Sequence, residues 1–355
     1  MNFSRRTILK SLCGVCVLPT KMFDIAHFKA ASKTKAYKGA IDTHAHVYPA
    51  KYLDFLERIG VSASRTKVAR DIQASDEEKD MLARLKMMDD AGIQKQVLSV
   101  TPQLPLVDCE QNAAEAVRMA NHIYANLIAK FPARFIAYGA TPLPHTELAI
   151  KEVAYCLDEL KFHGMTITTV LQNGLSIADE RFAPFYAELN RRHAILYIHP
   201  TGSGACSSMI NQADLAWVNG APVEDATAVL QLLKAEIPHR YPNIRFHIAH
   251  LGGDLAFLSQ RLEDNFEDWH SFKHSPRESL RRMWFDSANF YAPSLRLALK
   301  TYDPKRVMLG SDYPYFRYKK YTRAVGYIKE AKLPANIEAD ILYRNAYTFY
   351  GLHAD

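Results

Sequence analysis

Short apolar runs alternate with longer amphipathic segments along the chain from Gly39 to its end. The short runs are rich in Val, Ile, Leu, Phe and Tyr and stop at Gly, Pro or Asn, which is typical of strands buried in a parallel sheet. The pattern predicts eight such strands, over residues 40–47, 96–101, 134–141, 164–169, 195–199, 244–250, 283–288 and 307–312. It predicts helices between them, among them residues 111–130, 145–160, 180–192, 223–236 and 255–265.

Eight strands separated by helices favour a closed (β/α)8 TIM barrel, although an open doubly wound sheet would show the same alternation. We therefore expect residues 39–355 to form one α/β barrel. Residues 51–80, between the first and second strands, form an unusually long polar stretch. We expect this stretch to be an inserted loop or small subdomain over the top of the barrel, where substrate specificity would lie.

Composition and charge exclude several classes of protein. The chain has 355 residues, 48% hydrophobic and 23% charged, which is ordinary for a globular protein and excludes a disordered chain or a disulfide scaffold. The formal charge is +6, but residues 1–40 hold eight of the 44 basic and one of the 38 acidic residues, so the remainder carries 36 basic and 37 acidic residues. A nucleic-acid partner therefore has no support from charge.

The N-terminal segment, residues 1–38, has the three-part layout of a secretory leader. The run from Ser4 to Lys10, with Arg5 and Arg6 at its centre, resembles the twin-arginine export signal, and an apolar stretch from Leu12 to Leu18 follows. We expect export to the periplasm, while an ordinary basic N-terminus stays open. The apolar stretch is too short for a stable membrane span, and no later segment is long enough.

Five candidate metal ligands or catalytic groups lie where predicted strands end. His44 and His46 are two residues apart, so on a strand both side chains point to one face and can reach one ion. His199, His250 and Asp312 close the fifth, sixth and eighth strands. Strand C-termini of a β/α barrel meet at one face, so these side chains are expected to converge. Imidazole and carboxylate suit a divalent ion such as Zn²⁺ or Mn²⁺.

Five sequence stretches carry a resemblance to a known family. They are Ile41-Asp-Thr-His-Ala-His46, Phe131-Pro-Ala-Arg-Phe135, Gly220-Ala-Pro-Val-Glu-Asp225, Ala249-His-Leu-Gly-Gly253 and Val307-Met-Leu-Gly-Ser-Asp-Tyr-Pro314. Together they resemble the amidohydrolase superfamily, within it the branch of 2-amino-3-carboxymuconate-6-semialdehyde decarboxylase. The resemblance covers nearly all of residues 40–350 and implies a TIM barrel of the metal-dependent hydrolase type.

The resemblance also implies the roles of the site residues. It makes His44, His46, His199 and Asp312 the ligands of one divalent ion, Zn²⁺ or Mn²⁺, and His250 the acid/base; Asp312 counts as catalytic too. His163-Gly164 stands where relatives often have Lys-Gly, which argues against a bridged pair of ions. A cation held this way lowers the pKa of a bound water toward neutrality.

We therefore expect a metal-dependent decarboxylase that acts on a small carboxylated unsaturated or aromatic acid. A metal-dependent hydrolase of a lactone, ester or amide would use the same apparatus and stays the alternative. A non-catalytic barrel that kept the metal ligands is a second alternative.

Five further residues carry expectations about substrate, packing and assembly. Arg261 matches a family arginine that reaches the active site across a homodimer interface, although a packing role is equally compatible. A second substrate arginine is either Arg65 or Arg70. Trp217 either lines the pocket mouth or packs. His247 has the opposite strand parity to His250, so we expect it to pack outward against a helix.

Overall fold

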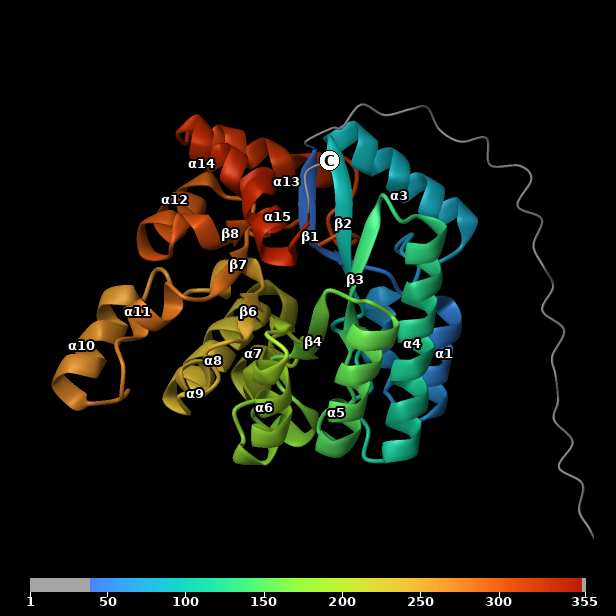
Figure 1. Ribbon diagram of the computed structural model, residues 1–355, viewed down its shortest axis with the longest axis horizontal. Helices are drawn as coiled ribbons and strands as arrows, with labels where there is room; N and C mark the ends of the chain where they lie inside the picture. Colours follow the sequence, from blue (N-terminus) through green and yellow to red (C-terminus); the bar gives the residue numbers. More distant parts are fainter. Residues whose placement is uncertain (1–38, 353–355) are drawn as a thin grey trace, which may run out of the picture. The chain divides into compact units, whose positions relative to one another are not determined.

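The computed structural model describes residues 39–352, which form a single eight-stranded parallel sheet wrapped by helices (Figure 1). Neighbouring strands pair in chain order, which is the order of a (β/α)8 barrel and confirms the predicted fold. The strands are β1 (Ala40–His46), β2 (Ile93–Ser99), β3 (Phe135–Ala140), β4 (Gly164–Thr168), β5 (Ile195–His199), β6 (Arg245–Ile248), β7 (Trp284–Asp286) and β8 (Val307–Met308). The predicted leader, residues 1–38, lies outside the described residues.

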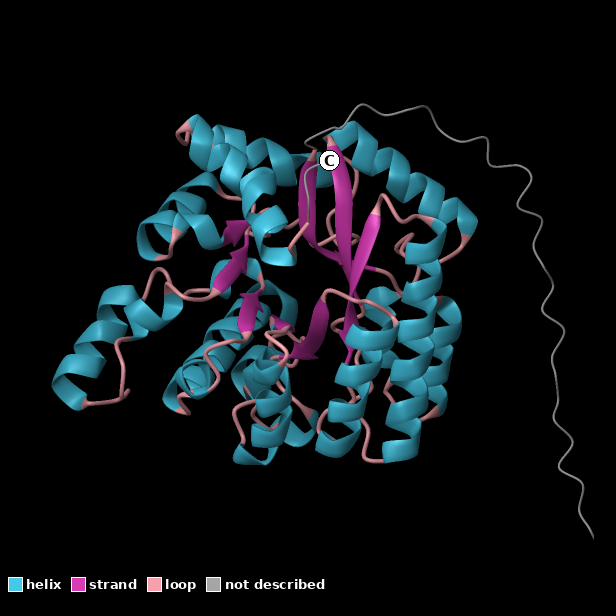
Figure 2. Cartoon of the chain, viewed as in Figure 1, coloured by secondary structure: helices cyan, strands magenta, loops and turns pink. Residues whose placement is uncertain are grey.

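Helices follow the strands and cover the outside of the barrel (Figure 2). They are α1 (Ala50–Arg58), α2 (Ala63–Thr66), α3 (Glu78–Ala91), α4 (Glu110–Lys130), α5 (Thr146–Ala154), α6 (Ala183–Arg191), α7 (Ser208–Gln212), α8 (Ala221–Lys234), α9 (Ile237–Arg240), α10 (Ser259–Trp269), α11 (Pro276–Leu280), α12 (Ala292–Thr301), α13 (Lys319–Glu330), α14 (Ala335–Ala339) and α15 (Asn345–Tyr350). Strands β3, β4 and β5 are buried along their whole length, because helices cover one face and the barrel interior the other.

The barrel is closed by the segment that follows β8. The amide of Thr43 donates to the carbonyl of Leu309 at 2.8 Å, that of Asp312 to His44 at 2.9 Å, and that of His46 to Tyr313 at 2.7 Å. The predicted eighth strand, 307–312, is therefore shorter than expected, because the backbone leaves the extended conformation and reaches a φ of +53° at Asp312. This closure sets Asp312 beside β1.

The long stretch after β1, expected to be an inserted loop or small subdomain, is mostly helical. It contains α1, α2 and the short helix η2 (Lys67–Ala69), and bends over residues 70–77 lead from η2 into α3. Buried side chains of α1, Tyr52 and Leu56 among them, pack it onto the barrel.

The last helix, α15, covers the end of the barrel at which the strands begin. Phe349 and Tyr350 pack among side chains from the starts of the strands, including Ile41 and Trp284. The rings of Phe349 and Trp284 are in contact, with 4.6 Å between their centroids. The C-terminal helix therefore fills the barrel interior at the end where the strands begin.

Among residues 39–352 there is no helix with the length and apolar character needed to cross a membrane.

Candidate metal centre

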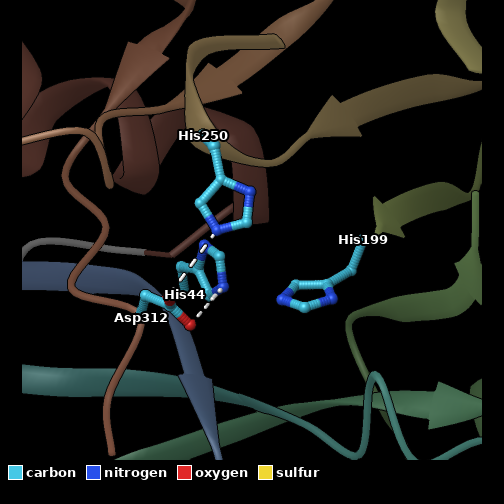
Figure 3. A group of neighbouring side chains, drawn as sticks. All are labelled: His44, His199, His250 and Asp312. Atoms are coloured by element: carbon cyan, nitrogen blue, oxygen red, sulfur yellow. Dashed lines mark ion pairs between the residues drawn. The ribbon is translucent and has the colours of Figure 1, made fainter. Parts of the chain in front are cut away.

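The five side chains predicted at the strand ends converge on one space at the C-terminal face of the barrel. His44 Nε2 lies 3.1 Å from His46 Nε2 and 3.3 Å from Asp312 Oδ1. The ring centroid of His199 lies 5.0 Å from that of His44 and 4.8 Å from that of His46. His250 Nε2 lies 3.6 Å from Asp312 Oδ2. Figure 3 shows four of these side chains reaching into the shared space: His44 from β1, His199 from the end of β5, and His250 and Asp312 from the segments that follow β6 and β8.

Each imidazole in this group is held through its Nδ1 atom. His44 Nδ1 lies 3.0 Å from Asp286 Oδ2, and His250 Nδ1 lies 2.9 Å from Asp225 Oδ2. The partners of the other two rings are backbone carbonyls: Ser99 for His46 at 3.2 Å and Pro200 for His199 at 2.8 Å. Carbonyl and carboxylate oxygens accept, so each Nδ1 donates and each Nε2 faces the shared space, where it presents a lone pair whenever the ring is neutral.

The chemistry of this donor set fits a divalent metal ion. His199 Nε2 is buried and has no hydrogen-bond partner within residues 39–352, although an orphaned buried nitrogen costs free energy. One ion shared by the imidazoles and Asp312 would give every inward lone pair a partner. Three nitrogens with one carboxylate oxygen is a combination that Zn²⁺ and Mn²⁺ accept.

Burial and charge divide the histidines into two groups when no ion is bound. Burial lowers the pKa of His46 to about 4 and that of His199 well below its usual range, so both rings are neutral. Burial also opposes protonation of His44, but Asp286 and Asp312 outweigh it and raise the pKa of His44 to about 9. Asp225 and Asp312 likewise outweigh burial and raise the pKa of His250 well above its usual range.

The two oxygens of Asp312 separate His250 from the other histidines. Oδ1 faces His44 and His46, at 3.3 and 3.2 Å, whereas Oδ2 faces His250. The rings of His44, His46 and His199 are fully buried or nearly so, whereas the His250 side chain is 15% exposed. Potential ligand atoms of His44, His199, His250 and Asp312 also lie within 4.8 Å of one another, so His250 is near enough to act on anything held there.

Asp286 is a site residue that sequence reasoning missed. Its Oδ1 accepts hydrogen bonds from the amides of His250 and Ala288, both at 3.1 Å, and its Oδ2 accepts from His44. Although burial opposes it, the interaction with His44 and the contacts with His247 hold the pKa of Asp286 well below its usual range. Its position near the end of the seventh predicted strand, residues 283–288, was the signal that could have found it.

Glu224 and Asp225 belong to the stretch 220–225, which carried part of the family resemblance but gave neither residue a functional role. Asp225 orients His250. Glu224, also buried, accepts hydrogen bonds from the hydroxyls of Thr169 at 2.7 Å and Thr201 at 2.6 Å. It thereby ties the chain after β5 to the start of α8.

An apolar pocket of about 440 Å³ leads from the surface to the centre. His199, His250 and Asp312 lie in its wall, and Val68 from η2 contributes from the inserted stretch. Its aromatic and apolar lining includes Trp217, Val218, Phe290, Tyr315 and Phe316. Trp217 therefore lines the pocket mouth, the first of its two expected positions; its ring stacks on Tyr315 with 6.4 Å between centroids.

The three arginines with expected substrate roles lie in different surroundings. Arg261 is exposed on α10, outside the lining of this pocket, so within one chain the structure does not bring it to the centre. Arg70 is paired with Glu57 at 2.7 Å and Asp54 at 2.8 Å. Arg65 is half-buried, donates to the carbonyl of Pro102 at 3.1 Å and lines a neighbouring pocket of about 310 Å³.

The prediction that His247 packs outward is wrong. The side chain is fully buried inside the barrel, against Tyr138 of β3, Tyr197 of β5 and Phe349 of α15. Strand β6 ends at Ile248, and His250 adopts a φ of +52°, so alternation along a strand does not relate the two histidines.

Comparison with known families agrees with the fold and the centre. The amidohydrolase family model matches residues 41–352. This chain belongs to the amidohydrolase family. The predicted membership is therefore confirmed.

Relatives of this amidohydrolase are named as decarboxylases. It is 28% identical over 296 residues to 2-amino-3-carboxymuconate-6-semialdehyde decarboxylase of Dictyostelium discoideum, covering 78% of this chain and 81% of that one. It is 27% identical over 319 residues to 6-methylsalicylic acid decarboxylase of Aspergillus aculeatus, covering 86% and 94%.

A solved structure shares the fold. The structure of a dihydroxybenzoic acid decarboxylase from a Polaromonas species, with bound manganese and the inhibitor 2-nitroresorcinol, has a TM-score of 0.76 and 20% identity. The match covers 88% of this chain and 97% of that one.

Proposed function

We propose that this amidohydrolase is a metal-dependent decarboxylase of small aromatic or unsaturated carboxylic acids. The observation that carries the proposal is the convergence of imidazoles, each held through Nδ1, with Asp312 at the base of an apolar, aromatic-lined pocket. The names of its relatives support a carboxy-lyase, and a flat ring acid suits a pocket lined by Trp217, Phe290 and Phe316.

His44, His46, His199 and Asp312 would hold one divalent ion, either Mn²⁺ or Zn²⁺. When bound, the ion supplies a Lewis acid that stabilises negative charge on oxygen and lowers the pKa of a water molecule. Manganese in the Polaromonas relative supports this choice of ion. Asp312 would contribute Oδ1 to the ion, while its Oδ2 faces His250.

His250 is the proton donor of the proposed reaction. Decarboxylation of an aromatic acid forms a C–H bond and breaks the C–C bond to the carboxylate; the bonding electrons remain with the ring and carbon dioxide leaves. Asp225 keeps His250 protonated and oriented, with Nε2 toward the pocket. A charged imidazolium at that position delivers the proton to the ring carbon.

Arg65 is the better candidate of the two loop arginines for a substrate carboxylate. The guanidinium of Arg70 is already paired with two carboxylates, those of Asp54 and Glu57. Burial lowers the pKa of Arg65, and the one hydrogen bond from its guanidinium goes to a backbone carbonyl. A half-buried guanidinium that forms no ion pair within the described residues favours an anionic ligand.

Carbon dioxide release in labelled water tests the proposed function. Purified protein loaded with Mn²⁺ or Zn²⁺ is incubated in ¹⁸O-water with hydroxybenzoates, muconates and lactones, and the products are followed by mass spectrometry. Carbon dioxide with no label in the organic product supports the decarboxylase. Label in a new carboxylate identifies a hydrolase, and no turnover in any arm supports a barrel that only binds ligands.

We also propose a homodimer and export. The resemblance that gives Arg261 a role across a subunit interface motivates the dimer, and the exposed position of this residue on α10 is compatible with it. The twin-arginine pattern at Arg5 and Arg6 motivates export to the periplasm. Sedimentation velocity tests the dimer, and fractionation of cells that express the chain with Arg5 and Arg6 replaced by Lys tests export.

A further inference from the structure

A line of buried polar groups runs through the barrel from the C-terminal helix to the centre. The Tyr350 hydroxyl on α15 contacts the Tyr138 hydroxyl on β3, which lies 2.8 Å from His247 Nδ1. His247 Nε2 lies 3.5 Å from Asp286 Oδ2, the same oxygen that accepts from His44 Nδ1. All five side chains are buried, with Tyr350 the most accessible of them at 7% exposure.

Hydrogen-bond chemistry gives this line one direction. Asp286 Oδ2 lies 3.5 Å from His247 Nε2, which is within ion-pair distance but is not a formed hydrogen bond, and Nε2 has no hydrogen-bond partner within residues 39–352. A carboxylate oxygen attracts an N–H and repels a lone pair, so this placement favours the tautomer of His247 that carries its hydrogen on Nε2. Burial lowers the pKa of His247, so the ring is neutral and its Nδ1 accepts. The Tyr138 hydroxyl therefore donates to His247, and the Tyr350 hydroxyl donates to Tyr138.

We propose that His247 is a positioning residue for the metal ligand His44, set in its donor tautomer by Tyr138 and Tyr350. The two histidines turn N–H groups toward one carboxylate oxygen of Asp286, at 3.0 Å from His44 Nδ1 and 3.5 Å from His247 Nε2. They fix the rotation of that carboxylate and with it the direction of His44 Nε2. This inference rests on the proposed metal centre, and it extends that centre to the C-terminal helix at the far end of the barrel.

Packing alone does not account for these residue types. Burial of a hydroxyl or an imidazole costs free energy unless it is hydrogen-bonded, and aliphatic side chains would fill the same space at lower cost. Tyr197 provides a contrast in the same layer. Its ring lies 4.6 Å from that of His247 and 5.6 Å from that of His44, but its buried hydroxyl has no partner in the described part of the chain.

Metal affinity of the stripped protein tests the proposal without any substrate. Mn²⁺ is titrated into metal-free wild-type protein and into four variants, with the dissociation constant read by calorimetry and by the electron paramagnetic resonance of free Mn²⁺. His247→Leu removes the donor, and His247→Gln returns an N–H₂ near the position of Nε2. Tyr138→Phe frees the tautomer of His247, and Tyr197→Phe is the matched control for loss of a buried hydroxyl.

The expected order of dissociation constants follows the line of hydrogen bonds. His247→Leu weakens Mn²⁺ binding about tenfold or more, Tyr138→Phe weakens it several-fold, and His247→Gln recovers most of the loss, whereas Tyr197→Phe equals the wild type. Thermal unfolding of the metal-free variants separates a loss of affinity from a loss of stability.

Two results would overturn the inference. A wild-type affinity in His247→Leu would show that the ring only fills space. Equal losses in Tyr138→Phe and Tyr197→Phe would show that the barrel interior responds to any lost hydroxyl. If the wild type itself bound no Mn²⁺ or Zn²⁺, the proposed metal centre would fail and this inference with it, so the two failures are distinguishable.

Discussion

His250 and Asp225 form a pair in which Nδ1 of the partly exposed imidazole lies 2.9 Å from Oδ2 of the buried carboxylate. Asp225 lies one turn into α8, and His250 lies just beyond the end of β6. The contact fixes the ring so that Nε2 faces the pocket and Asp312. An acid held this way is ready to give a proton to a bound substrate.

His250→Asn and His46→Asn are expected to divide metal binding from catalysis. His250→Asn keeps its metal, because Asp312 Oδ1 and the three other rings remain, but turnover falls by at least about 100-fold through loss of the proton donor. His46→Asn loses metal and activity together. Metal content by mass spectrometry of the purified proteins, next to carbon dioxide release, checks both. Metal loss in His250→Asn would instead make His250 a ligand.

Asp225→Asn is expected to shift the pH dependence of turnover. Asp225 and Asp312 hold the pKa of His250 above its usual value, against the effect of burial. Removal of the Asp225 charge lowers that pKa, so the acid form is lost at lower pH and the alkaline limb of the kcat profile moves down by about one pH unit or more. Steady-state rates across pH with the Mn²⁺-loaded enzyme measure the shift. An unmoved limb would exclude His250 as the group that titrates.

Metal uptake is expected to release a proton from His44. The pKa of His44 is raised to about 9 in the metal-free protein, so the ring is protonated at neutral pH and must lose its proton to bind an ion. Apparent affinity therefore rises with pH up to about 9, by about tenfold for each pH unit. Calorimetry at one pH in two buffers of different ionisation enthalpy counts the released proton. A count of zero at pH 7 would contradict the raised pKa.

Gly202→Ala is expected to disturb the pocket mouth through Trp217. A Cβ atom at Gly202 would lie 2.1 Å from Cζ2 of the indole, so the ring must leave its place on Tyr315. We expect KM to rise several-fold with metal content unchanged, because the displaced ring lines the substrate pocket and touches no ligand. Steady-state kinetics on the best acid of the panel measure the change.

Gly92→Ala is the matched control for that substitution. Gly92 has a φ of +70°, close to the +78° of Gly202, but a Cβ atom there would meet nothing within 4 Å. It carries the same backbone cost without the collision. Equal kinetic changes in the two variants would assign the effect to backbone strain and not to displacement of the Trp217 ring.

The sequence by itself determined the barrel and most of the centre. Strand-like and helix-like runs alternate along the chain, and the spacing of apolar residues within each run is visible in a single sequence. Eight strand-like runs separated by helices are compatible with few architectures other than a barrel. His44, His46, His199, His250 and Asp312 could be predicted because parallel strands in a barrel all end at one face. A residue at a strand end is therefore near the others, whatever the rotamers are.

Tertiary structure alone decided which atoms face inward and what holds them. Strand parity misplaced His247, because β6 ends before His250 and the backbone there turns through a positive φ. Asp286 is a single carboxylate in an apolar run, so only the ring of His44 beside it gives it a role. Tyr350 is 103 residues from His247 in the chain, and only the packing of α15 into the base of the barrel brings their side chains into one line. Local patterns record period and burial, whereas contacts between distant segments depend on how the closed barrel is filled.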